Sequence, residues 1–477
     1  MNIPLRRAAI LCAAMLFALL ANVTYIQGFT TARLNADARN QRMLISRFEH
    51  PRGKILTRDG TIIAASRRTK NASYAYRRTY PGGNLYAAVT GHSSLYTTTG
   101  LERAEDAALT GSDPRVRVRA LVTDGISEGA DVRTTIEQHV QRAAYQGLAA
   151  TGRRGAAVAL DPTTGAILAM VSYPSYDPNL YTTFDGAKLT EIDTLFHADP
   201  GRPLLNRVLN QNYPPGSTFK VVTSAAALNS GTYASASAVD APIRLLLPGT
   251  STYLRNAGGE SCGDGRPALA FAFQISCNTA FAAMGLDMGQ DTLRQQAEAF
   301  GFNDDTLTVP MPVSMSVYPS GLDQAQTAMS AIGQFNDRAT PLQIAMLSAA
   351  VANGGALMRP YLVEEVRLPD GSVIDRAEPS QWRSVMSARE AAQLTAMMVE
   401  VTEQGGTGTA AALPDVQVAA KTGTAENVQG AEDHALLTAF APAGSPRVAV
   451  GVVVEQAGSG GDVAAPIARQ IMQAVLT

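Results

Sequence analysis

The strongest constraint on this chain lies at its N-terminus, where a long apolar stretch follows two arginines. The segment Ala8–Ile26 is uncharged and mostly apolar. As a helix it spans about 28 Å, which is close to the hydrocarbon thickness of a bilayer. A cleaved signal peptide is the alternative, but cleavage after Ala21 puts the bulky Leu19 where a small residue is required. We therefore expect a retained signal anchor, with Arg6 and Arg7 inside and the rest of the chain exported.

The composition of the chain is that of a packed body with one membrane segment. Its 477 residues are enough for two or three domains, and 46% of them are hydrophobic, too few for a polytopic membrane protein. Lys and Arg number 39 against 41 Asp and Glu, a net charge of −2. Without a basic excess to hold phosphates, the sequence argues against a nucleic-acid partner.

Two regions follow the apolar segment. Residues 27–130 are irregular and Arg-rich with glycine turns, and they contain no cluster that suggests chemistry. We expect a small β-rich or mixed membrane-proximal module there. From Asp131 the pattern changes, and Val132–Gly147 has a helix-like alternation. The apolar runs Gly155–Leu160 and Ala166–Val171, joined by a Pro- and Gly-containing turn, predict a β-hairpin.

The remainder predicts helices and then more strands. Ala- and Met-rich stretches between residues 220 and 398 are typical of helices, and Leu342–Asn353 follows Thr340 and an N1 proline. A terminal helix is expected over Ala465–Val475. Late strands are expected at Val416–Lys421, Leu436–Phe440 and Arg447–Glu455. We expect the early hairpin and these late strands to form one sheet, with the helical block inserted between them.

A serine and a lysine stand three residues apart where a Pro-Gly turn gives way to a helical run. These are Ser217 and Lys220, in the segment Tyr213–Lys220. Three residues make about one helical turn, so both groups share a face. The helix N-terminus and partial burial both disfavour a charged ammonium, so a neutral Lys220 can accept the Ser217 proton. A chance pairing is the alternative, yet of five lysines only Lys220 has Ser three positions before it.

A second lysine opens the segment Lys421-Thr422-Gly423-Thr424, which follows an apolar strand. This places it on a strand that we expect at a sheet edge, where an extended peptide can pair and Gly423 leaves room for the ligand backbone. Thr422 and Thr424 then offer hydroxyls to a carboxylate, and Lys421 offers positive charge. An exposed strand end with solubilising residues is the alternative.

The triplet Ser276-Cys277-Asn278 lies between two helical stretches, and helix capping explains it equally well. Cys277 and Cys262 lie outside the cytoplasm, where either a disulfide or two separate buried thiols are compatible with the sequence. None of the five histidines has a metal-ligand spacing such as His-Glu-x-x-His, so we expect neither a metal nor another cofactor. We interpret His434, which stands near the Lys-Thr-Gly segment, as structural.

The order Ser-x-x-Lys, Ser-x-Asn, Lys-Thr-Gly is the signature of the penicillin-recognising serine acyl enzymes. The chain resembles the class B penicillin-binding proteins, most closely the penicillin-binding protein A type of actinobacteria, over nearly its whole length. Further matching motifs are Arg52–Gly60, Tyr80 to Gly91, Gly100-Leu101-Glu102, Leu205-Asn206-Arg207, Gly333-Gln334 and Thr340–Gln343. One departure is His434, which aromatic residues usually follow in the family but which here precedes Ala-Leu-Leu.

The resemblance implies an α+β fold: a penicillin-binding or serine β-lactamase-like transpeptidase domain, an antiparallel sheet with an inserted helical subdomain, over residues 131–477. Three segments would precede this domain. They are a cytoplasmic tail at 1–7, a transmembrane signal anchor at 8–26 and a non-catalytic pedestal- or dimerisation-like module at 27–130.

The resemblance also implies the role of each motif. Ser217 would attack the bond between the last two D-alanines of a peptidoglycan stem peptide, with Lys220 as base. Backbone N–H groups of Ser217 and Thr424 would form the oxyanion hole. Ser276, in contact with Lys220 and Lys421, would relay a proton to the departing D-Ala, and Asn278 would bind the donor amide. Thr422 and Thr424 would hold its terminal carboxylate.

The implied partners are peptidoglycan stem peptides or their lipid-linked precursor, β-lactam antibiotics, and a membrane glycan polymerase of the shape or division family. Two other functions remain open. A D,D-carboxypeptidase or β-lactamase-like hydrolase has the same acylation apparatus, and a non-catalytic scaffold of the wall machinery has the same tethered architecture. The membrane anchor and exported module favour a wall synthase over a hydrolase, and the intact Ser217 and Lys220 argue against a scaffold. A bifunctional class A enzyme is disfavoured because the segment before residue 131 is too short for a glycosyltransferase.

Overall fold

The computed structural model describes residues 3–30, 47–70, 74–116, 128–426 and 430–477. Parts of the expected tail and module, residues 1–2, 31–46, 71–73 and 117–127, lie outside the described residues. The chain forms two units, one of residues 1–51 with 66–77 and one of residues 52–65 with 78–477, and each is described by itself.

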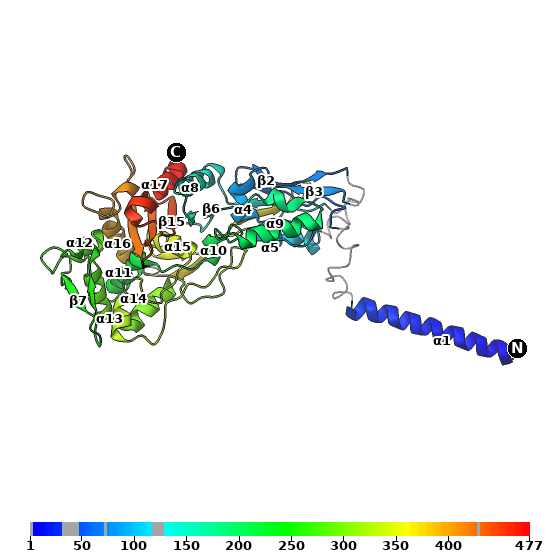
Figure 1. The fold of residues 1–477 in the computed structure, drawn as a ribbon, viewed down its shortest axis with the longest axis horizontal. Coiled ribbons are helices and arrows are strands. Elements are labelled where there is room, and N and C mark those ends of the chain that lie inside the picture. The colour runs from blue at the N-terminus through cyan, green and yellow to red at the C-terminus, as the bar shows by residue number, and fades with distance from the viewer. Residues whose placement is uncertain (1–2, 31–46, 71–73, 117–127, 427–429) are drawn as a thin grey trace. The chain divides into compact units, whose positions relative to one another are not determined.

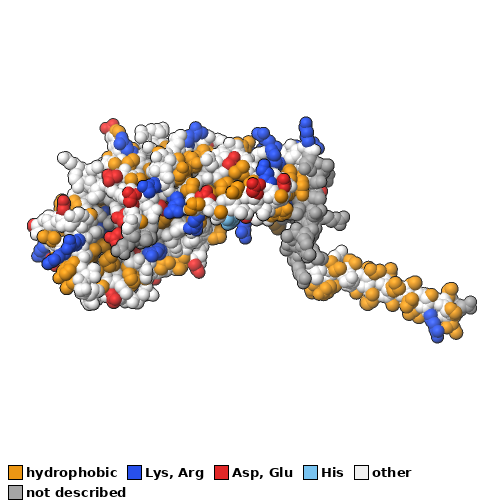
Figure 2. All heavy atoms as spheres, viewed as in Figure 1, with side chains coloured by type: hydrophobic (Ala, Val, Ile, Leu, Met, Phe, Trp, Pro, Cys, Tyr) orange, Lys and Arg blue, Asp and Glu red, His pale blue; other side chains and the backbone are white. Residues whose placement is uncertain are grey.

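The first unit contains one helix long and apolar enough to cross a membrane. It comprises α1 (Ile3–Tyr25) and a π-helical turn (Ile26–Thr30), and none of its side chains is buried. Figure 2 shows hydrophobic side chains along α1, with basic side chains near its N-terminal end. The helix begins before and continues beyond the predicted span at 8–26.

The larger unit is centred on a five-stranded antiparallel sheet in the order β13-β14-β15-β5-β6. The hairpin β5 (Gly155–Leu160) and β6 (Ile167–Tyr173) pairs through β5 with β15 (Val448–Val454), which continues to β14 (His434–Ala441) and β13 (Ala419–Ala425). The predicted sheet of early and late strands is therefore confirmed. Nearly every residue of β5, β14 and β15 is buried, because helices cover both faces.

The covering helices differ in character. On one face α8 (Gln138–Ala150) and α17 (Ala465–Leu476) pack against each other and on the sheet. On the other face α15 (Pro341–Ala352) crosses β14, β15 and β5 and is buried at nearly every position (Figure 1). Thr340 caps α15 by accepting a hydrogen bond from the Gln343 N–H, as its sequence predicts. The Cβ of an alanine at Gly451 would lie 2.6 Å from the Ala345 nitrogen, so this helix requires glycine on β15.

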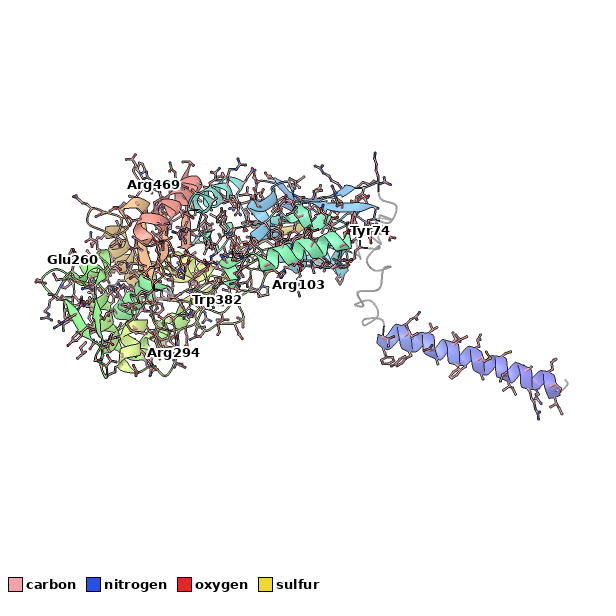
Figure 3. The ribbon with its side chains drawn as sticks, viewed as in Figure 1. Tyr74, Arg103, Glu260, Arg294, Trp382 and Arg469 are labelled. Atoms are coloured by element: carbon pink, nitrogen blue, oxygen red, sulfur yellow. A yellow bond between two sulfur atoms is a disulfide. The ribbon has the colours of Figure 1, made fainter. Side chains whose placement is uncertain are left out.

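The helical block lies between β6 and β13 in sequence. Its helices are α9 (Gly186–Ala198), α10 (Arg207–Asn210), α11 (Lys220–Asn229), α12 (Leu269–Gln274), α13 (Asn278–Ala299), α14 (Gln324–Ser330) and α16 (Ala388–Glu400). Two small sheets accompany them, formed by β7 (Arg244–Leu246) with β8 (Tyr253–Arg255) and by β9 (Ala356–Met358) with β12 (Gln381–Ser384). The only tryptophan, Trp382 on β12, is labelled in Figure 3.

A second, six-stranded sheet joins the module to the transpeptidase-like body. Its order is β11-β10-β4-β1-β2-β3, and the short helices of the module stand beside it. The strands are β1 (Ile55–Leu56), β2 (Ile62–Arg68), β3 (Tyr76–Thr79), β4 (Asp131–Thr134), β10 (Val363–Arg367) and β11 (Val373–Arg376), and the helices are α4 (Ala87–Thr90), α5 (Gly100–Ala104) and α6 (Asp106–Thr110). Because β4 is a strand, the helix expected over Val132–Gly147 begins only at Gln138. Because β10 and β11 come from late in the chain, the sheet crosses the sequence boundary expected at residue 130.

A buried ion cluster explains two of the module motifs. Glu102, which has no exposed surface, accepts hydrogen bonds from Arg52 Nε at 3.0 Å and from Arg78 Nε at 2.5 Å. Tyr80 Oη lies 3.2 Å from the same carboxylate, and Arg52 also pairs with Asp106. The arginines lower the pKa of Glu102 despite its burial. Arg52 and Glu102 thus form one electrostatic contact between segments that lie 50 residues apart in the sequence.

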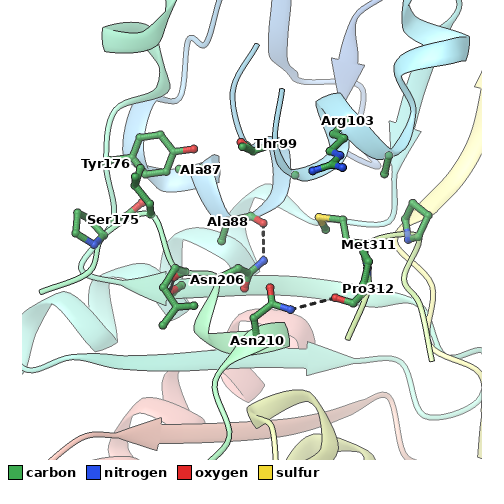
Figure 4. Close-up of a pocket in the computed structure, with 18 residues that line it drawn as sticks. Ala87, Ala88, Thr99, Arg103, Ser175, Tyr176, Asn206, Asn210, Met311 and Pro312 are labelled. Atoms are coloured by element: carbon green, nitrogen blue, oxygen red, sulfur yellow. Dashed lines mark hydrogen bonds between the residues drawn. The ribbon is translucent and has the colours of Figure 1, made fainter. Parts of the chain in front are cut away.

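A cavity of about 590 Å³ lies where the module meets the body, and Figure 4 shows its walls. Thr99 and Arg103 come from the module, and Tyr176 comes from the body. Asn206 donates a hydrogen bond to the Ala88 carbonyl at 2.9 Å. The Leu-Asn-Arg motif therefore fastens the start of α10 to the module.

We expect Glu102→Gln to lower the free energy of unfolding by about 3 kcal/mol, because it leaves two buried guanidiniums without a full counter-charge. Urea denaturation of the full chain, followed by Trp382 fluorescence, measures the change. Glu191→Gln, at an exposed site on α9, is the matched control. Equal free energies of unfolding in the two variants would show that the cluster does not stabilise the fold.

Candidate active site

The turn before α11 presents Ser217 and buries Lys220. A 3-10 turn (Gly216–Phe219) carries the serine, and α11 begins at Lys220, so the pair spans the junction rather than one continuous α-helix. Ser217 is partly exposed, whereas Lys220 has no exposed surface. Gly216 has φ of +52°, a conformation that favours glycine. The turn therefore exposes the hydroxyl and sends the amine inward.

Lys220 Nζ contacts the Ser-x-Asn triplet. It donates to the Ser276 carbonyl oxygen at 2.8 Å and to Asn278 Oδ1 at 2.7 Å, and it lies 3.1 Å from Ser276 Oγ. Among the described residues it makes no ion pair and no hydrogen bond to Ser217. A neutral amine has two N–H donors and one lone pair, so the two oxygens satisfy its donors and the Ser276 hydroxyl faces its lone pair.

Burial sets the charge of both lysines. Burial lowers the pKa of Lys220 well below its usual value, and the nearby charge of Lys421 lowers it further. Burial also lowers the pKa of Lys421, to about 7. The rings of Phe281 and Phe273 lie 5.5 Å from Lys220 Nζ and Lys421 Nζ respectively. Burial therefore favours the uncharged form of Lys220, which is the form of an amine that can accept a proton.

The strand that carries Lys421 is the edge strand β13, as its sequence predicts. Lys421 Nζ donates to the Thr422 carbonyl at 3.1 Å, and among the described residues it has no hydrogen bond to Ser276, a contact that the resemblance implies. Thr422 Oγ1 lies 2.6 Å from Thr407 Oγ1. Thr407 was not predicted, because a threonine between glycines carries no recognisable motif.

Packing within the protein gives a reason for Gly423 in addition to the expected one. A Cβ at this position would lie 2.9 Å from Thr218 Cγ2, 3.1 Å from Leu436 Cβ and 3.3 Å from the Pro215 carbonyl oxygen. Its missing side chain thus makes room for the turn that carries Ser217. Close packing between β13 and that turn fixes the distance between strand and serine.

The Ser276–Asn278 triplet forms the connection between α12 and α13. Ser276 has φ of +58°, which is rare for a residue with a side chain. Cys277 forms a disulfide with Cys262, and the Thr279 N–H donates to Asn256 Oδ1 at 3.0 Å. The disulfide and this hydrogen bond hold the strained turn against Lys220.

One cavity of about 890 Å³ collects the predicted residues. Ser217, Ser276, Asn278, Thr422 and Thr424 line it. Lys220 and Lys421 lie beneath its floor without exposed surface. Thr407 and the backbone of β8 complete the walls. A hydroxyl close in sequence to a buried amine, in a cavity that is also lined by the threonines of an edge strand, is an arrangement for acyl transfer from a peptide.

Comparison with known proteins identifies the fold around this cavity. Residues 155–473 match the model of the penicillin-binding protein transpeptidase domain, and residues 52–132 match the penicillin-binding protein A dimerisation domain. The chain belongs to the penicillin-binding protein transpeptidase family. This confirms the family resemblance and the α+β fold class inferred from the motifs.

Relatives match over the whole length of this penicillin-binding protein. It is 45% identical to the peptidoglycan D,D-transpeptidase PbpA of Mycolicibacterium smegmatis, covering 100% of this chain and 99% of that one. The PbpA of Mycobacterium tuberculosis is 42% identical with the same coverage. The penicillin G acyl-enzyme structure of M. tuberculosis penicillin-binding protein A superposes with a TM-score of 0.86 at 40% identity, covering 90% of this chain and 100% of that one.

We expect Lys421→Met to flatten the pH dependence of stability. Above pH 7 the folded protein holds Lys421 mostly neutral, while the unfolded chain keeps it protonated up to its usual pKa. Unfolding then takes up a proton, so wild-type stability falls as pH is lowered from 9 towards 7, by up to about 1.4 kcal/mol per pH unit for this group. Urea denaturation at several pH values measures the slope. Lys188→Met, exposed on α9, is the control, and an unchanged slope in Lys421→Met would refute the burial argument.

We expect Gly423→Ala to slow acylation by benzylpenicillin about tenfold or more, because the added Cβ displaces the Ser217 turn from β13. Stopped-flow acylation measures the rate. Gly444→Ala, where an added Cβ meets nothing within 4 Å, is the control. Equal rates in both variants would show that the turn does not depend on this contact.

Proposed function

We propose that the protein is a penicillin-sensitive peptidoglycan D,D-transpeptidase that works through an acyl-enzyme at Ser217. The observation that supports this most directly is the buried Lys220, which contacts Ser276 and Asn278 and whose pKa burial lowers well below its usual value, three residues after a partly exposed Ser217. The transpeptidases named above supply the substrate class. Acyl-enzyme structures with ceftriaxone and penicillin G, described for M. tuberculosis penicillin-binding protein A, support β-lactam sensitivity.

Acylation uses the two lysines differently. Lys220 accepts the Ser217 proton as Oγ bonds to the carbonyl carbon of the penultimate D-Ala. Backbone N–H groups of Ser217 and Thr424 stabilise the oxyanion. The C–N bond to the terminal D-Ala then breaks, and Ser276 passes a proton from Lys220 to the leaving amine. Thr422 and Thr424 hold the terminal carboxylate on β13, and the buried Lys421 supports that strand by donating to the Thr422 carbonyl.

Transfer reverses the proton route. Asn278 holds the amide of the bound donor through its side chain once that side chain leaves Lys220. An amine from a neighbouring stem peptide attacks the ester carbonyl and loses a proton to Lys220, and the C–O bond to Ser217 breaks. Ser217 recovers its proton, and a new amide cross-links the two stems.

The position of the enzyme in the cell follows from its N-terminus. We assign residues 1–7 to a cytoplasmic tail, 8–26 to the signal anchor, 27–130 to the module and 131–477 to the catalytic domain. Arg6 and Arg7 favour a cytoplasmic N-terminus and an extracytoplasmic active site. A module between anchor and active site suits a partner in the membrane, and a glycan polymerase that supplies uncross-linked strands is the partner that this chemistry requires.

We expect a fluorescent penicillin to label the full chain in detergent, and Ser217→Ala to abolish the label. Ser251→Ala, an exposed serine, is the control and is expected to label like the wild type. The label should persist for minutes because the acyl-enzyme waits for an amine. Labelling that survives Ser217→Ala would contradict the nucleophile, and release within milliseconds would indicate a β-lactamase.

A further inference from the structure

A second cavity, of about 300 Å³, lies beside the active-site cavity and is strongly basic. Four arginines and two glutamates line it, an excess of two positive charges; these are Arg154, Arg202, Arg207, Arg338, Glu426 and Glu455. His434 also lines it, but burial lowers the pKa of this histidine, so it adds no charge at neutral pH. We call this cavity the arginine pocket.

Two of the four arginines share one carboxylate, which cancels one of their two positive charges. Glu455 pairs with Arg154 Nε at 2.8 Å and with Arg207 Nε at 3.1 Å, and it accepts a hydrogen bond from Tyr213 Oη at 2.8 Å. Arg207 is almost fully buried and also donates to the Gly201 carbonyl. In this part of the arginine pocket, the charged side chains already have hydrogen-bond and ion-pair partners within the protein.

The other two arginines keep their charge for a ligand. Among the described residues, neither Arg202 nor Arg338 has a carboxylate within ion-pair distance. Arg202 reaches only Gln211 Oε1, at 3.5 Å, and Arg338 Nη1 donates to the carbonyls of Phe335 and Asp337. The neighbouring carboxyl of Asp337 is buried and forms no ion pair with Arg338 among the described residues; burial raises its pKa well above the usual value, although the charge of Arg338 opposes that rise.

The arginine pocket is mechanically tied to the nucleophile. Gln334 and Glu426 line both cavities, so the two adjoin. The Gly216 N–H donates to the Gly333 carbonyl at 2.9 Å, and Tyr213 and Ala339 exchange two backbone hydrogen bonds. A Cβ at Gly333 would lie 2.1 Å from the Gly216 carbonyl oxygen. The loop that carries Arg338 is thus packed directly on the turn that carries Ser217.

We propose that the arginine pocket binds a carboxylate of the acyl acceptor, one attached to the same carbon as the attacking amine. This rests on the proposed transpeptidase function, which needs two peptides at one serine. The donor carboxylate has its own place on β13, among threonine hydroxyls in the other cavity. Paired guanidiniums recognise a carboxylate through charge-assisted hydrogen bonds, and fixing it next to Ser217 orients the adjacent amine toward the ester.

The test compares two acceptor peptides that differ in one carboxylate. Their third residue is meso-diaminopimelate or lysine, which present the same side-chain amine with and without a carboxylate on its carbon. With a D-Ala-D-Ala peptide as donor and the full chain in detergent, chromatography of the cross-linked product gives both transfer rates. We expect the wild type to prefer the diaminopimelate acceptor about tenfold. We expect Arg338→Gln and Arg202→Gln each to reduce this ratio several-fold.

Controls separate binding from folding. Arg338→Lys keeps the charge and should keep part of the preference, and Arg389→Gln, exposed on α16, should keep all of it. Labelling by fluorescent penicillin reports that each variant is folded with an intact Ser217, and Arg202→Gln is informative if Arg338→Gln does not fold.

The outcomes distinguish this proposal from the function on which it rests. Equal rates with both acceptors in a wild type that penicillin labels would overturn the arginine pocket and leave the transpeptidase standing. Slower donor acylation in the arginine variants with an unchanged acceptor ratio would also overturn it, since the pocket would then serve the donor. Loss of penicillin labelling in the wild type would instead refute the proposed function itself.

Discussion

The burial of Lys220 without an acidic partner among the described residues is the constraint on which the site depends. An ammonium placed there loses its hydration and gains no counter-charge, so burial lowers its pKa and favours the neutral amine. A carboxylate beside it would have restored the charge and removed the base. Among the described residues, Lys220 Nζ instead contacts uncharged oxygens of Ser276 and Asn278 and lies over the ring of Phe281.

Holding such an amine in place needs a rigid surrounding, and three contacts provide it. The disulfide of Cys262 and Cys277 fixes the turn that presents Ser276. Gly423 lets β13 close on the serine turn, and α11 is buried along nearly its whole length. Among these contacts, only the turn at Ser276 has an unfavourable backbone conformation, which the packing around it must stabilise. The lowered pKa of Lys220 therefore depends on the packing of several segments of the fold around it.

Sequence reasoning recovered what local patterns encode. Periodicity gave the hairpin β5–β6 and the three late strands, and the Thr340-Pro341 pair gave the start of α15. It was wrong about the start of α8, since a short strand with the same apolar alternation precedes it and pairs with β10, more than two hundred residues away. The three motifs predicted Ser217, Ser276, Asn278, Thr422 and Thr424, a minority of the residues that line the active-site cavity, because each motif has a recognisable spacing.

What it missed depends on contacts between distant segments. Thr407 meets Thr422 only after β13 is in place. The packing of Gly423 against Thr218 was not predicted, because Thr218 lies in a distant segment of the sequence. The arginine pocket gathers Arg154, Arg202 and Arg338 from three unconnected loops, in a chain where arginine is common. No motif within one segment predicts such a cluster. Only the folded chain shows which of its arginines pair with a carboxylate and which do not.

The arginine pocket bears on why an acyl-enzyme of this kind forms cross-links instead of being hydrolysed. Water and an amine compete for the same ester, and water is present at far higher concentration. A site that binds the acceptor raises the local concentration of its amine and leaves that of water unchanged. Guanidiniums serve this purpose because water gains nothing from their charge, whereas a carboxylated amine gains both affinity and orientation. Neutral Lys220 then takes the proton from whichever nucleophile is held in line, so the choice between transfer and hydrolysis is made by binding rather than by the base.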